Sequence, residues 1–138
     1  MADTKSFDIV VYGATGFTGR LVAEYLTQTY GQDSGIKWAM AGRSAEKLAA
    51  VRDEIGAPKD TPFVVADASN PDSIREMVRN TKVVLTTVGP YQLYGSDLVA
   101  ACAELGTDYV DLCGEPPWMR QMIDLHADTA KKSGARIV

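Results

Sequence analysis

The chain has 138 residues, 46% of them hydrophobic, and a formal net charge of −4, which suits one compact domain with a sizeable core. The acidic balance argues against binding to nucleic acid, because readers of a phosphate backbone carry an excess of Lys and Arg. No window resembles a membrane-spanning helix or a signal peptide, so we expect a cytoplasmic protein with no transmembrane segment in this chain. Cys102 and Cys113 form no CxxC pair and no His-rich cluster, so we expect no metal site.

Apolar, β-branched segments typical of buried parallel strands alternate with segments of helical periodicity. Ser44 and Asn70 are expected to cap the starts of helices, and Gly106 to end one. In chain order we expect strand 7–13, helix 17–29, strand 36–42, helix 45–55, strand 62–67, helix 71–80, strand 82–89, helix 96–105, strand 107–112, helix 117–132 and the start of a sixth strand at 135–138.

Strict alternation of strands and helices with short connections predicts an α/β fold with a mostly parallel sheet. We expect the doubly wound Rossmann arrangement, with strand order 3-2-1-4-5-6 and helices on both faces. We interpret residues 1–138 as a single NAD(P)-binding domain. On this interpretation they are the N-terminal fragment of a longer protein, whose C-terminal domain for substrate binding and dimerisation is absent.

The stretch VYGATGFTGR, residues 11–20, places three glycines at intervals of three between the first strand and the first helix. Such glycines permit a tight turn, a close approach of a pyrophosphate to the backbone, and close packing of the helix on the sheet. A turn without a ligand is the alternative, and a P-loop is excluded because no Lys-Ser or Lys-Thr pair follows. The expected cofactor contacts are Gly13, Ala14, Thr15, Gly16, Phe17, Thr18 and Gly19.

The second strand ends in AGRS, with Arg43 and Ser44 where an NAD-binding site usually has an acidic residue. A guanidinium group suits the additional phosphate of NADP(H), and the Ser44 hydroxyl adds a second polar contact. We therefore expect NADP(H) rather than NAD(H). The alternative is that Arg43 is an exposed side chain paired with Glu46 or another nearby acid.

The remaining strand ends follow from the fold, since ligands bind at the carboxyl edge of such sheets. We expect the third strand to flank the adenine and the fourth to lie along the nicotinamide. The alternative for Asp67 is a loop acid that caps the next helix, and the alternative for Gly89 and Pro90 is a plain turn. The residues concerned are Asp67 and Ala68 after the third strand, and Val88, Gly89, Pro90 and Tyr91 after the fourth.

Several motifs together resemble the N-terminal cofactor domain of the saccharopine dehydrogenase family, in particular its saccharopine dehydrogenase-like oxidoreductases and trans-acting enoyl reductases. They are YGATGFTGR, AGRS, ADAS, GARIV and, the most specific, the block from Gly89 to Glu115 that reads GPY-x3-G-x3-V-x-AC-x3-G-x2-Y-x-D-x2-GE. The resemblance covers nearly the whole chain. It implies an NADP-dependent oxidoreductase whose second domain completes the pocket for a small-molecule substrate, with a homodimer as the expected assembly.

The resemblance implies hydride transfer to an imine or to an enoyl substrate in the full-length protein, and the sequence does not separate the two. A short-chain dehydrogenase mechanism is excluded, because no tyrosine is followed by lysine four residues later. The fragment alone is expected to be inactive. A non-catalytic NADP(H)-binding or sensor module is the alternative, whereas no basic amphipathic helix favours a protein of lipid surfaces.

Candidates for a direct part in the chemistry follow the fourth and fifth strands. Tyr91 and the nearby Tyr94 can pack against a nicotinamide or offer a hydroxyl, and Glu115 can orient the nicotinamide amide or the substrate. A packing role for the tyrosines and a solvated loop acid are the alternatives. Cys113 as a nucleophile needs a base, and the only histidine, His126, lies within a helix, so a small buried thiol is the expectation.

Overall fold

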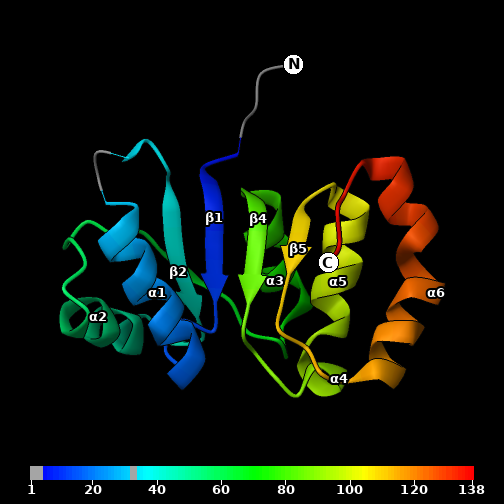
Figure 1. Ribbon diagram of the computed structural model, residues 1–138, viewed down its shortest axis with the longest axis horizontal. Coiled ribbons are helices and arrows are strands. Elements are labelled where there is room, and N and C mark those ends of the chain that lie inside the picture. The colour runs from blue at the N-terminus through cyan, green and yellow to red at the C-terminus, as the bar shows by residue number, and fades with distance from the viewer. Residues whose placement is uncertain (1–4, 32–33) are drawn as a thin grey trace.

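The computed structural model describes residues 5–31 and 34–138, which form one α/β unit (Figure 1). All strands run parallel in the order β3-β2-β1-β4-β5, so the expected α/β Rossmann topology is confirmed. The elements are β1 (Phe7–Tyr12), α1 (Phe17–Thr29), β2 (Trp38–Gly42), α2 (Ala45–Glu54), β3 (Phe63–Val65), α3 (Pro71–Arg79), β4 (Thr81–Thr86), α4 (Tyr91–Tyr94), α5 (Ser96–Leu105), β5 (Asp108–Val110) and α6 (Pro116–Ser133).

The sixth strand is the one element of the expected order that is missing, and its place holds a single parallel bridge between Tyr109 and Ile137. Tyr109 donates to the Arg136 carbonyl at 2.9 Å, and Val138 donates back to the Tyr109 carbonyl at 2.9 Å. Two hydrogen bonds around one residue make a bridge and not a ladder. The segment therefore starts the expected pairing next to β5 without forming a strand.

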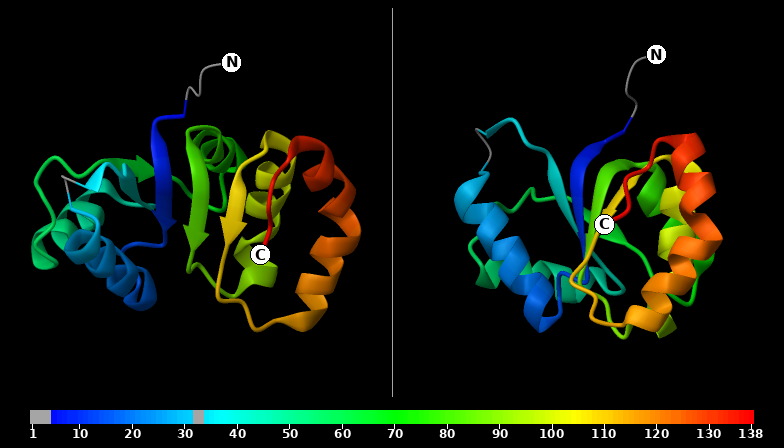
Figure 2. Two further views of the ribbon diagram at one scale, coloured as in Figure 1. Left: turned by 45° about the horizontal axis from the view of Figure 1, so that its top comes forward. Right: turned by 45° about the vertical axis from the view of Figure 1, so that its right-hand side comes forward.

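The sheet carries helices on both faces, as Figures 1 and 2 show: α1 and α2 lie on one side, and α3 and α5 on the other. Alternation along β1 divides its side chains between two cores. Val11 packs with Met40 and the helices α1 and α2, whereas Val10 packs with Val84 and the helices α3 and α5. Both valines are fully buried, as expected for the central strand of a parallel sheet.

The face that carries α1 and α2 is covered over only part of its width. In Figure 1 none of the described helices crosses in front of β4. The side chains that β4 and β5 present there, Val83, Leu85 and Val110, are only partly buried. Large apolar side chains also stand on the exposed side of α1, with Phe17 84% and Tyr25 58% exposed. The described residues thus leave an apolar area beside α1.

Helix boundaries follow the capping signals. The Ser44 hydroxyl accepts a hydrogen bond from the Lys47 amide at the start of α2, and the Asn70 side chain accepts from the Ser73 amide at the start of α3. Gly106 ends α5 in the left-handed conformation, with φ of 74°. No helix in the described part of the chain is long and apolar enough to cross a membrane.

The contact between α1 and the end of β1 leaves no room for a side chain at Gly19. A Cβ atom built there lies 1.9 Å from the carbonyl oxygen of Gly13, and backbone cannot yield as a flexible side chain would. We expect Gly19→Ala to lower the free energy of unfolding by about 3 kcal/mol or more, because it overpacks a rigid contact. Chemical denaturation measures the effect. Gly114→Ala is the control, since its Cβ meets nothing within 4 Å, and equal stability of the two variants would contradict the expectation.

Candidate functional site

A groove of about 460 Å³ runs along the carboxyl edge of the sheet, across the ends of β1, β2, β3 and β4. Its size is that of a cleft for a small molecule or cofactor. Its position is where doubly wound sheets bind their ligands. The residues that line it are Tyr12, Gly13, Thr15, Gly16, Gly42, Arg43, Asp67, Ala68, Ser69, Thr87, Val88, Gly89 and Tyr94.

The floor of the groove is the turn that joins β1 to α1. Gly13 adopts φ of 93°, and a Cβ there would lie 2.8 Å from both Thr87 Oγ1 and Val88 Cγ2, so this position requires glycine. Its amide donates to the Ala41 carbonyl at 3.0 Å, which fastens the turn to β2. The backbone is therefore held against the ends of two neighbouring strands.

The first turn of α1 differs from those of α2 and α3 in having no side-chain cap. Its N-cap is Gly16, and no side chain accepts a hydrogen bond from the amides that follow; the first turn also carries no acidic residue. Free amide groups at a helix start carry partial positive charge and bind anions. Because Thr15 and Gly16 line the groove at this point, the residues present fit a pyrophosphate.

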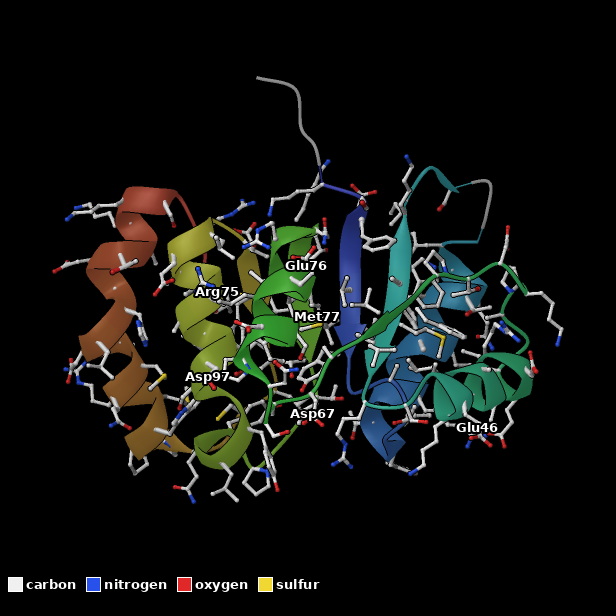
Figure 3. The ribbon with its side chains drawn as sticks, turned by 180° about the vertical axis from the view of Figure 1, so that it is seen from behind. Glu46, Asp67, Arg75, Glu76, Met77 and Asp97 are labelled. Carbon is white, nitrogen blue, oxygen red and sulfur yellow. The ribbon has the colours of Figure 1, made fainter. Side chains whose placement is uncertain are left out.

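The far end of the groove holds one positive and one negative side chain, Arg43 after β2 and Asp67 after β3. Asp67 accepts hydrogen bonds from the Ser69 amide and the Ser69 hydroxyl, each at 2.9 Å, and these bonds lower the pKa of its carboxyl group, with a smaller contribution from Arg43. Figure 3 places Asp67 at the lower edge of the sheet. The carboxylate is thus directed to its own turn, and the cap of α3 is Asn70.

Arg43 is exposed and lies at the groove, and it forms no salt bridge with Glu46 or any other described residue. Ser44 does not line the groove. Its hydroxyl accepts the Lys47 amide at 3.3 Å and so serves as the N-cap of α2. Of the two residues expected to select the additional phosphate, Arg43 is the one that faces the groove.

The opposite end of the groove is formed by Val88, Gly89 and Tyr94, the last carried by the short helix α4, which the sequence pattern did not predict. Tyr91 begins α4 but lies behind the groove wall, 6% exposed, with its ring stacked on Trp118 at a centroid distance of 5.7 Å. Burial raises the pKa of its hydroxyl, which donates to the Thr86 carbonyl at 3.4 Å.

Glu115 also lies outside the groove lining, at the N-cap of α6. Its carboxylate accepts hydrogen bonds from the Tyr91 amide at 2.7 Å and the Gln92 amide at 3.1 Å. Both oxygens of this acid are therefore engaged by the start of α4.

The structure brings some of the predicted residues together at the groove and leaves others outside its lining. Those that the structure brings together there are Gly13, Thr15, Gly16, Arg43, Asp67, Ala68, Val88 and Gly89. Those that do not line the groove are Ala14, Phe17, Thr18, Gly19, Ser44, Pro90, Tyr91 and Glu115. Neighbours that the sequence analysis did not name are Tyr12, Gly42, Ser69 and Thr87. The rule that strand ends line the site could have found them, since each lies within two residues of a named position.

Comparisons with known proteins identify the family of the chain. The family model described as "Saccharopine dehydrogenase NADP binding domain" matches residues 9–138. The chain belongs to this family. The match confirms the expected family and the expected cofactor class, NADP(H).

Proteins named trans-acting enoyl reductase are similar over almost the whole chain. That of Mycobacterium ulcerans is 52% identical over 97% of this chain, and that of Mycobacterium leprae is 52% identical over 99%. This chain spans only 32% of the length of each.

Two solved structures show the same fold at low identity. Apo saccharopine dehydrogenase (L-Glu forming) from Saccharomyces cerevisiae has a TM-score of 0.72 at 18% identity, covering 95% of this chain and 26% of that one. Citrobacter sp. triphenylmethane reductase, complexed with NADP(H), has a TM-score of 0.64 at 17% identity, covering 95% and 48%.

The two cysteines are predicted to differ in reactivity. Burial raises the pKa of the Cys102 thiol to about 12, and the side chain is fully enclosed, so almost no thiolate forms at neutral pH. Cys113 is partly exposed, although burial raises its pKa also. We expect a thiol reagent to label one cysteine per folded chain, at a rate that rises with pH because the thiolate is the reactive form. Labelling of both at equal rates before denaturation would contradict this, and Cys102→Ala should leave the count in the folded state unchanged.

Proposed function

We propose that this chain is the NADP(H)-binding domain of an oxidoreductase that, as the full-length protein, transfers a hydride to the double bond of an enoyl substrate. The observation that carries the proposal is the groove itself, with the uncapped start of α1 at its floor and an exposed arginine at its far end. The relatives named trans-acting enoyl reductase favour the enoyl substrate over the imine.

Within this proposal, each part of the groove has one task. The helix start beside Thr15 and Gly16 binds the pyrophosphate with its uncapped amides, and Arg43 binds the additional phosphate of the adenosine half with its planar set of donors. Ala68 flanks the adenine, while Val88, Gly89 and Tyr94 form the wall beside the nicotinamide. The cofactor, when bound, supplies the hydride, and the protein orients it and excludes water.

A second domain is part of the same proposal. This chain spans 32% of the length of the two relatives named trans-acting enoyl reductase. Parallel sheets are normally covered on both faces, whereas the apolar area beside α1, which includes Val83 and Leu85 of β4, is only partly covered by the described residues. We propose that the rest of the full-length protein packs there and completes the substrate pocket. A homodimer and a cytoplasmic location stay predictions.

A binding module without turnover is the second candidate, and one observation favours it for these 138 residues. The two side chains considered for chemistry, the Tyr91 hydroxyl and the Glu115 carboxylate, both bond to groups outside the groove lining. Two tyrosines line the groove, Tyr94 and Tyr12. Tyr12 is buried, and this burial raises the pKa of its hydroxyl.

Arg43→Ala tests the assignment of the cofactor. We expect wild-type protein to bind NADPH more tightly than NADH, and the variant to bind NADPH about 10 to 100 times more weakly, since a hydrogen bond to a charged group contributes about 1.5–3 kcal/mol. Affinity for NADH should change little. Isothermal titration calorimetry gives both constants. Arg75→Ala, which removes an arginine paired with Glu104 away from the groove, is the matched control. Equal affinity of wild-type protein for the two cofactors would refute the NADP part.

The division of labour between the two parts of the protein is also testable. We expect the 138-residue chain to bind NADPH but not to oxidise it with an enoyl thioester or an imine substrate, because the proposal assigns the completion of the substrate pocket to the second domain. Absorbance of NADPH at steady state is the measurement. Turnover by this chain alone would overturn the proposed need for a second domain. Absence of turnover from the full-length protein, with NADPH bound, would favour the sensor module.

A further inference from the structure

The end of β5 is connected to α4 by a continuous series of hydrogen bonds. The buried Tyr109 hydroxyl donates to one Asp111 oxygen at 2.5 Å, and the Cys113 amide donates to the other at 3.0 Å. The Glu115 amide in turn donates to the Cys113 sulfur at 3.3 Å. The loop that carries Glu115 is thus held in a defined position relative to the core of the sheet.

From that loop, the Glu115 carboxylate accepts the first two amides of α4, those of Tyr91 and Gln92. Amides at a helix start lack partners within the helix, and a carboxylate is their strongest neutral-pH acceptor. The helix has four residues, so two fixed amides define the position of all of it. Glu115 therefore fixes the start of α4.

A second attachment orients α4 without replacing the first. The Tyr91 ring stacks on Trp118 of α6, and the Trp118 indole donates to the Ser96 hydroxyl at 3.0 Å. A Cβ at Gly95 would lie 2.9 Å from Trp118, so the chain passes this ring closely. The ring contact holds α4 against α6, whereas the carboxylate fixes the first two amides of α4, close to Gly89.

The position of α4 matters because residues at both of its ends form part of the groove wall. Gly89 precedes it and Tyr94 ends it, and both line the groove, whereas Glu115 does not. No other described carboxylate bonds to these amides. We propose that Glu115 is a positioning residue, which fixes through α4 the wall beside the nicotinamide and so controls the binding of that half of the cofactor. The inference rests on the proposed NADP(H) binding.

The test compares two ligands. Adenosine 2′,5′-bisphosphate occupies only the adenine half, and NADPH occupies both. We expect Glu115→Ala to weaken NADPH binding about tenfold while adenosine 2′,5′-bisphosphate binds within about twofold of wild type, because the adenine half is formed by other strand ends. Glu115→Gln keeps one acceptor oxygen, so its affinity for NADPH should lie between those of wild type and Glu115→Ala. Glu104→Ala, which removes an exposed carboxylate paired with Arg75, should change neither affinity.

The outcomes separate the two proposals. Wild-type protein that binds neither ligand refutes the proposed function. Wild-type protein that binds both, with equal losses for the two ligands in Glu115→Ala or with no loss, refutes the positioning role. Should Glu115→Ala fail to fold, Glu115→Gln carries the test, since a selective loss of NADPH affinity supports the role and an unselective one overturns it. Fluorescence of the bound reduced nicotinamide is an independent readout, and it should differ between wild type and Glu115→Gln.

Discussion

The close approach of α1 to the turn after β1 is the constraint on which the groove depends. Gly19 has no side chain because the Gly13 carbonyl occupies the space that a Cβ would need. This contact brings the start of α1 to the edge of the sheet, where Thr87 and Val88 at the end of β4 also crowd Gly13. Free amides of a helix start, the backbone of a turn and two strand ends therefore meet at one point. Glycine is the one residue type that fits at both positions, 13 and 19.

The features that the sequence predicted well are those determined by neighbours in the chain. Runs of apolar residues predict the buried strands, and Ser44 and Asn70 cap helices that begin at the next residue. The order of the strands followed from strict alternation of strand and helix, because right-handed crossovers leave few arrangements open. The positions of Gly13, Gly16, Arg43 and Asp67 at the groove followed from that order, since parallel strands end at a common edge.

The features that the sequence could not predict depend on partners distant in the chain. The sequence from Tyr91 to Tyr94 does not predict a four-residue helix, because the partners that hold it are distant in the chain. Glu115, 24 and 23 residues away, accepts its first two amides, and the Tyr91 ring stacks on Trp118. Glu115 was expected near the chemistry because it follows β5, but proximity in topology does not say which way a side chain turns. Similarly, Ser44 was predicted both to cap α2 and to contact the cofactor, and its hydroxyl is used by the helix. The sixth strand failed for another reason, since a strand needs a ladder and Tyr109 shares only one bridge with Ile137.

The two ends of the groove are therefore stabilised in different ways. At the end proposed to bind the adenine, Asp67 bonds to Ser69 two residues later, and neighbouring strand ends are joined directly, since the Ala66 amide donates to the carbonyl of Gly42, the last residue of β2, at 2.9 Å. At the end proposed to bind the nicotinamide, the wall depends on contacts that bring β4, α4, β5 and α6 together. The first end is therefore held by backbone pairing within the sheet and by one local turn, whereas the second shifts when any one of its side-chain contacts is lost. Under the proposed function, a change in the hydrogen bonds of Glu115 would alter the wall beside the nicotinamide and leave the strand ends beside the adenine in place, because the hydrogen bonds that the described residues form at those strand ends involve no residue of α4.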